Sequence, residues 1–216
     1  MKVDILVPEH LSEITLEQYQ RFIKIQDSEA DETFLARKML EIFCGIELKH
    51  TLNLKLKDVK AVTEILTEMM NEKPQLVRTF KMGGVEYGFI PKLDEISLGE
   101  YVDLDTYLGD TENLHKAMSV LYRPIEQKYG ENYNIVEYKV SDGEIMKQMP
   151  LNAVFSSVLF FYRLGIDLSK VMMNYLEEAQ EEALIQHLSS QPNGDGINQS
   201  LHSLKEILHE LKISLN

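Results

Sequence analysis

Three aspartates close together in the sequence could do acid–base or metal chemistry. Asp103, Asp105 and Asp110 lie in one short stretch. Paired carboxylates can exchange protons with a substrate or share a divalent cation. However, we expect a helix here, and side chains two residues apart lie on different faces of a helix. The pattern favours a capped, acidic helix, and an enzyme using the Asp103 and Asp105 region stays open as an alternative.

Other residues with chemical potential form no recognisable motif. The sequence has no phosphate-binding GxxxxGK loop, HExxH zinc signature, GxSxG elbow or EF-hand spacing, and none of its 6 histidines has another at i+4. The single cysteine, Cys44, excludes an intramolecular disulfide, and we interpret it as a core residue of a protein made in a reducing compartment. We therefore predict no enzymatic activity, no cofactor and no metal.

The stretch that must position the aspartates begins with a predicted hairpin at about 79–90. Gly83 and Gly84 can both adopt positive φ, as a two-residue type I′ loop requires. This register places an opposite-charge pair, Lys81 and Glu86, on one face and apolar side chains on the other. The predicted pairs are Met82 with Val85, Lys81 with Glu86, and Phe80 with Tyr87.

A helix should follow the hairpin from about Leu98. Ser97 and Glu100 have the spacing of a capping box, and Thr15 and Gln18 repeat that signature near the N-terminus. Asp31 is a good cap for a further helix that Gly45 would end. Helical spacing predicts additional helices near 16–25, 58–73, 111–122 and 151–164, and a long one after 167, with β-like alternation over 128–140.

The two ends of the chain are predicted to be separable elements. Residues 1–7 alternate as a short edge strand or an extended arm would. Residues 191–196 read as a linker of turn residues, followed over 197–216 by an amphipathic helix. Packing against the parent domain and docking on a partner both fit this helix. Its apolar residues are Ile197, Leu201, Leu204, Ile207, Leu208 and Leu211.

We therefore predict a mainly α fold: a multi-helix bundle over 1–190 with a small antiparallel β-hairpin element and a tethered C-terminal helix. The net charge of −13 argues against broad nucleic-acid binding, although an acidic face lining a DNA channel stays open. We expect no signal peptide, because the apolar run at residues 1–8 is short and soon interrupted. We expect no membrane partner, because the most apolar run, 151–164, is too short to span a bilayer and carries Arg163.

Three runs within 80–124 resemble proteins of tailed bacteriophages. These runs are GVEYGFIP from Gly84, LGEYVDLD from Leu98 and HKAMSVLYRP from His115. They are similar to uncharacterised virion morphogenesis proteins of crAss-like and related phages, for which no catalytic residue is assigned. The resemblance implies a virion protein made in the cytoplasm of the host bacterium.

Two kinds of phage protein fit these features. We expect a structural protein of the neck or tail, a ring or connector component that forms a homo-oligomer and contacts other virion or tail proteins. A tail assembly chaperone absent from the mature virion is the alternative. The residues predicted to bind partners are Lys81, Gly83, Gly84 and Glu86 in the hairpin, and Leu201, Leu204, Leu208 and Leu211 in the C-terminal helix.

Overall fold

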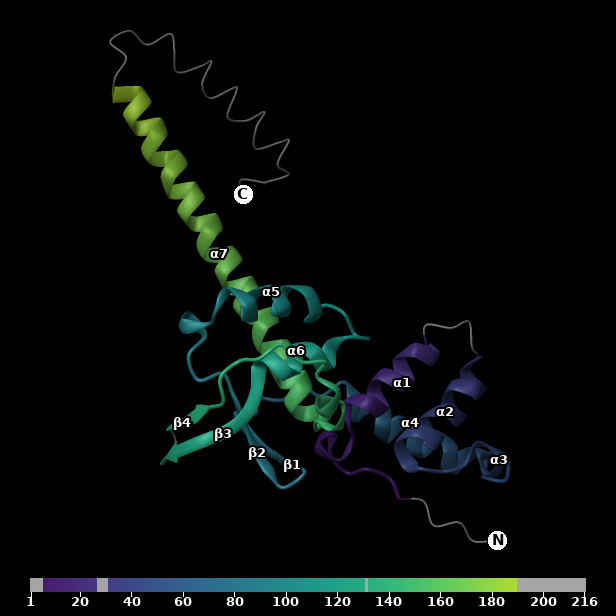
Figure 1. The fold of residues 1–216 in the computed structure, drawn as a ribbon. Coiled ribbons are helices and arrows are strands. Elements are labelled where there is room, and N and C mark those ends of the chain that lie inside the picture. Colours follow the sequence, from purple (N-terminus) through teal and green to yellow (C-terminus); the bar gives the residue numbers. More distant parts are fainter. Residues whose placement is uncertain (1–5, 27–30, 131, 190–216) are drawn as a thin grey trace. The chain divides into compact units, whose positions relative to one another are not determined.

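The computed structural model describes residues 6–26, 31–130 and 132–189, and the chain divides into two compact units, Met1–Tyr162 and Arg163–Asn216 (Figure 1). The predicted linker 191–196 and the helix over 197–216 lie outside the described residues, as does most of the N-terminal arm. The structure therefore leaves the predicted boundary near residue 190 untested.

The N-terminal part of the first unit is helical and begins as the sequence predicts. Thr15 caps the first helix, because its Oγ1 accepts the Gln18 amide at 3.3 Å while the Gln18 side chain accepts the Thr15 amide at 2.9 Å. Asp31 accepts the Phe34 amide at 2.8 Å, and Gly45 ends that helix with a φ of 68°. The elements are η1 (Leu11–Glu13), α1 (Leu16–Gln26), α2 (Glu32–Cys44), α3 (Leu48–Thr51) and α4 (Leu56–Met70).

The predicted hairpin is confirmed, but it belongs to a larger sheet. The register pairs Met82 with Val85 and Phe80 with Tyr87, as expected. Two further antiparallel strands extend this hairpin, and the four lie side by side in the order β1-β2-β3-β4 (Figure 1). The described residues thus combine helices with a four-stranded antiparallel sheet, which corrects the predicted helical bundle with a hairpin. The strands are β1 (Thr79–Met82), β2 (Val85–Phe89), β3 (Tyr122–Tyr129) and β4 (Asn132–Ile135).

The strand β3 begins earlier than the sequence suggests. Pro124 lies opposite Tyr87 in the middle of the sheet, although proline cannot donate to a strand ladder and normally argues against such a position. Its carbonyl still accepts the Val136 amide at 3.0 Å, and the register shifts between Ile125 and Gln127. The register shift next to Pro124 accommodates the proline within β3. The sequence around Pro124 therefore gave no sign that a strand begins there.

The second half of the first unit contains the predicted capping box. The Ser97 amide donates to Glu100 Oε2 at 2.7 Å, and the Glu100 amide donates to Ser97 Oγ at 3.3 Å. The other carboxylate oxygen of Glu100 accepts a hydrogen bond from Arg123 of β3 at 2.7 Å, which ties the helix start to the sheet. These later elements are η2 (Leu93–Glu95), α5 (Leu98–Tyr107), α6 (Leu114–Leu121), η3 (Glu144–Gln148) and α7 (Leu151–Ser189).

The helix α7 runs without a break through Gly165, where we expected one helix to end and another to begin. A glycine inside a helix costs about 1 kcal/mol relative to alanine, which the bonds of a long helix can offset. Leu151 and Val154 at its start are fully buried in the first unit. The Leu16 amide donates to Met149 O at 3.0 Å and the Leu151 amide to Ile14 O at 2.8 Å, joining α7 to the start of α1.

The core of the first unit centres on Tyr122, which is fully buried at the start of β3. Its ring packs edge-on against Phe80 and Phe89, with ring centroids 5.3 Å away in each case. Its hydroxyl donates to Val77 O at 2.8 Å and lies 3.4 Å from Ala153 O of α7. This side chain therefore links three segments that are distant in the sequence.

Candidate functional site

The predicted contact surface at the hairpin tip is exposed, but it is not a free finger. Gly83 and Gly84 have φ values of 56° and 78°, as the predicted loop requires. The other edge of β2 is paired with β3. Glu86 lies opposite Lys81 in the register, yet its carboxylate pairs with Lys128 of β3 at 2.5 Å. The hydrogen bond from Lys128 lowers the pKa of Glu86. The expected charge pair within the hairpin is thus replaced by one that holds β2 to β3.

The remaining predicted partner-binding residues, Leu201, Leu204, Leu208 and Leu211, lie outside the described residues. Their proposed role on a docking helix stays a prediction. Of the predicted partner-binding residues that the structure describes, Lys81, Gly83 and Gly84 are exposed. The carboxylate of Glu86 is paired with Lys128 within the sheet.

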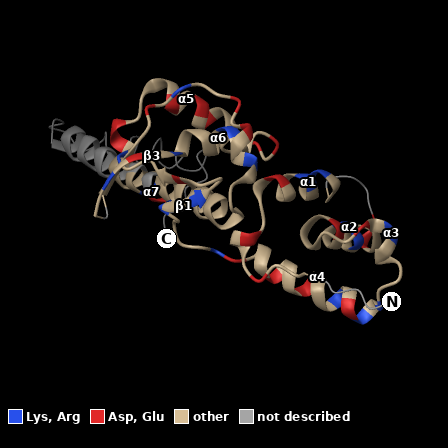
Figure 2. Ribbon diagram, turned by 60° about the horizontal axis from the view of Figure 1, so that its bottom comes forward, with Lys and Arg blue, Asp and Glu red and all other residues tan. Residues whose placement is uncertain are grey.

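The three aspartates that could have formed an acidic site have different partners. Asp103 accepts a hydrogen bond from the Tyr138 hydroxyl, Asp105 is exposed, and Asp110 accepts the side-chain amide of Asn113 at 2.7 Å. In the described ranges, no group of three or more His, Cys, Asp or Glu residues could hold a metal ion. The helix α5 carries three carboxylates and no Lys or Arg (Figure 2). Glu100 is buried and paired with Arg123, so the acidic surface of this helix comes from Asp103 and Asp105.

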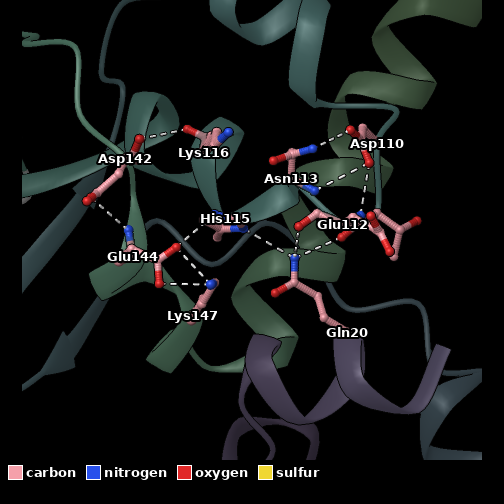
Figure 3. A network of polar contacts seen from close by, with 11 residues as sticks. Gln20, Asp110, Glu112, Asn113, His115, Lys116, Asp142, Glu144 and Lys147 are labelled. Atoms are coloured by element: carbon pink, nitrogen blue, oxygen red, sulfur yellow. Dashed lines mark hydrogen bonds and ion pairs between the residues drawn. The ribbon is translucent and has the colours of Figure 1, made fainter. Parts of the chain in front are cut away.

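A polar network connects α1, α6 and η3 (Figure 3). The side-chain amide of Gln20 donates to the carbonyl oxygens of Thr111 at 2.8 Å and Glu112 at 3.0 Å, and it lies 3.4 Å from Nδ1 of His115. On the other side of the ring, Nε2 of His115 lies 3.5 Å from Glu144 Oε1. One buried imidazole is therefore held between an amide on α1 and a carboxylate on η3.

The surroundings of His115 favour its neutral form. Burial, and then the charge of Lys147, lower the pKa of His115, while Glu144 opposes them. Lys147 is itself paired with Glu144 at 2.7 Å. At Gly143 an added Cβ would lie 2.8 Å from the carbonyl oxygen of His115, so the backbone of this loop packs directly against α6.

A cleft of about 460 Å³ borders this network and is lined by side chains of both charge signs. The imidazole nitrogens of His115 face Gln20 and Glu144. This geometry is better suited to holding α1, α6 and η3 together than to transferring a proton. Sequence reasoning did not find the network because its members are 95 and 29 residues apart (115 − 20 and 144 − 115) and match no local motif.

A second cleft, of about 400 Å³, lies beside the sheet. Its walls include Arg78, Lys92 and Tyr133, with Phe160 from α7. Tyr133 is held in place because its hydroxyl donates to Phe89 O at 2.9 Å. Lys92 is paired with the exposed Glu95 at 2.6 Å. The cleft combines basic groups with an aromatic wall.

The most distinctive surface is on α7 beyond the first unit. Leu164, Val171 and Tyr175 are 46%, 63% and 72% exposed. Over Leu151–Leu176 the helix is long and apolar enough to cross a membrane by length and composition alone. The buried start of this stretch accounts for part of that apolar character, whereas the later residues have no cover among the described residues. The sequence contained this apolar spacing, but the expected break at Gly165 obscured its continuity.

No family model matches the chain, and neither a curated protein nor a solved structure shows significant similarity to it.

Proposed function

We propose that this chain is a non-enzymatic protein of tailed-phage assembly, a structural component of the neck or tail that acts through protein–protein contacts. The observation that carries the proposal is the exposed apolar surface of α7 around Leu164, Val171 and Tyr175. The phage setting is proposed from the resemblance of three sequence runs to phage morphogenesis proteins. The proposal includes self-association and contacts with other virion or tail proteins in the host cytoplasm and in the particle.

The energetic reason is the cost of leaving these side chains in water. Burying a Leu or Val side chain contributes about 1.5–3 kcal/mol, and an exposed apolar patch typically marks an interaction surface. Several such residues on one helix could therefore stabilise a complex substantially. Covering this apolar surface with another chain therefore lowers the free energy of the helix.

A protein partner explains this surface better than a bilayer. Leu151 and Val154 are buried in the first unit, so the beginning of the apolar stretch is already used. From residue 163 to 176 a helix rises roughly 21 Å at 1.5 Å per residue, less than the roughly 30 Å of a bilayer interior. This segment also carries Arg163, Asp167 and Lys170. These features support contacts with protein and the absence of a membrane partner.

A tail assembly chaperone is the second candidate. The same open apolar surface favours it, because a chaperone must present apolar groups that its client covers for a limited time. The hairpin tip at Gly83 and Gly84 supplies an additional accessible contact in either case.

Mass spectrometry of purified particles and of infected-cell complexes separates the two candidates. A structural protein is present in purified particles in a fixed ratio to other tail proteins. A chaperone is bound to tail proteins in infected cells and missing from particles. A chain found in neither would contradict both candidates.

A further inference from the structure

The helix α5 in the first unit leaves several apolar side chains uncovered. Leu98, Tyr101 and Val102 are 78%, 56% and 50% exposed. Together with the exposed Asp105 they follow the spacing i, i+3, i+4, i+7, so the four share one side of the helix. No Lys or Arg lies on α5 (Figure 2). These four residues are called the α5 surface, which is apolar and acidic.

The beginning of α4 carries exposed apolar side chains with charges of the opposite sign. Leu52, shortly before this helix, and Leu56, its first residue, are each 70% exposed. Lys55, Lys57 and Lys60 are exposed close to them in the sequence. Within the described part of the chain, these three lysines form no ion pair with a carboxylate. These five residues are called the α4 surface, which is apolar and basic.

The charges of the two surfaces do not stabilise the helices that carry them. Lys55 is the N-cap residue of α4 and Lys57 lies in its first turn, whereas Asp105 lies in the last turn of α5. A helix is positive at its beginning and negative at its end, so each charge meets a helix end of its own sign. Asp58 is the one carboxylate in the first turn of α4, and it lies on a different side from Leu56. A molecule of opposite charge would therefore relieve both surfaces.

The α4 and α5 surfaces complement each other. Each combines exposed apolar side chains with charges of one sign, and the two signs are opposite. Because both surfaces are exposed in the same chain, neither covers the other within that chain. In a protein of net charge −13, the basic α4 surface is suited to an acidic partner, and a second copy of this chain offers one.

We propose that the α4 surface of one copy binds the α5 surface of another copy. Burial of the leucines against Leu98, Tyr101 and Val102 supplies the affinity, and the opposite charges fix which surfaces meet. Since the contact joins two different surfaces, each copy keeps one surface free for the next copy. Such a contact gives a closed ring or an open filament, depending on the rotation between copies. The inference rests on the self-association included in the proposed function.

Charge reversal in the full chain tests the pairing. Light scattering at increasing protein concentration should show the wild-type mass rising above 25.0 kDa. Lys60→Glu alone and Asp105→Lys alone should each raise the concentration needed for association roughly tenfold. The double variant should associate nearly as the wild type does, because the pair is restored with its signs exchanged. Lys73→Glu, at an exposed lysine beyond the end of α4, is the matched control and should behave as wild type.

A second pair of variants tests the apolar part of the contact. Leu56→Glu should abolish association without changing the far-UV circular dichroism. Ile65→Glu is its control, because Ile65 is 48% exposed on the same helix but lies on the side opposite Leu56. Equal effects of these two variants would overturn the contact, as would a double charge reversal that fails to restore association.

Failure of this contact can be told apart from failure of the proposed function. Wild-type association that Leu56→Glu and Lys60→Glu leave unchanged would overturn the contact and leave self-association in place. A wild-type protein that keeps the single-chain mass at every concentration would overturn both the contact and self-association. The presence of the chain in purified particles is measured independently of either result.

Discussion

The hydroxyl of Tyr122 offers the sharpest test of how the first unit is held together. Tyr122→Phe keeps the ring and removes only the group that donates to Val77 O at 2.8 Å. Tyr122 is fully buried and Val77 is partly buried, so access of water to the unpaired carbonyl is restricted. A buried acceptor left without a partner costs about 1–3 kcal/mol. For a chain of this size, a loss of 2 kcal/mol corresponds to a fall in Tm of about 4–8 °C.

The matched control is Tyr129→Phe, the same chemical change at a side chain that is 66% exposed. Its hydroxyl donates to Gln127 at 3.0 Å on the surface, so the expected change lies within about 0.5 kcal/mol. Urea unfolding followed by circular dichroism measures both variants. If Tyr122→Phe proved as stable as Tyr129→Phe, the link from β3 to the segment before β1 would not contribute as described.

Three further results are expected. Gly88→Ala should destabilise the sheet more than Gly109→Ala in thermal unfolding, because a Cβ at Gly88 would lie 2.4 Å from the Tyr133 ring whereas Gly109 has open space; equal effects would contradict this packing. The folded state lowers the pKa of His115, so the stability that its neutral form contributes is present above the unfolded pKa of about 6.5 and is lost as pH falls through the lower folded value. The free energy of unfolding should therefore fall less between pH 7 and 5 in His115→Gln than in wild type, and parallel curves would refute the assignment. Finally, the protein should stay with the aqueous fraction when floated with neutral phospholipid vesicles, and its recovery with the vesicles would favour a membrane role for α7.

Local signals in the sequence predicted the local structure well. The glycine pair predicted the hairpin register, and Thr15, Asp31 and Ser97 predicted three helix starts, because a turn or a cap depends on residues only a few positions apart. Pro124 gave a misleading signal for the same reason. β-like alternation was predicted only from residue 128, and a proline gives no local sign of the strand that the pairing with β2 stabilises at Pro124.

Long-range contacts could not be predicted in this way. No spacing rule brings Gln20 to His115 across 95 residues, or Lys128 to Glu86 across 42. Such pairs depend on how helices and strands pack, which one sequence does not show. The α7 surface is intermediate: its apolar positions are visible in the sequence, but their exposure becomes apparent once the helix is seen to continue past Gly165.

The most direct test of the account is whether the apolar side of α7 is needed for phage production. The proposed role in phage assembly implies that a phage deleted for this gene can be complemented from the host, so infectious titre would be measured with the wild-type chain, Val171→Glu or Lys170→Glu supplied there. Both variants introduce a glutamate on the exposed helix, but Lys170 is a charged residue, paired with Asp167 at 3.5 Å, and is not part of the apolar surface. The account predicts a large loss of titre for Val171→Glu and near-normal titre for Lys170→Glu. Full titre with a stably folded Val171→Glu protein would contradict it.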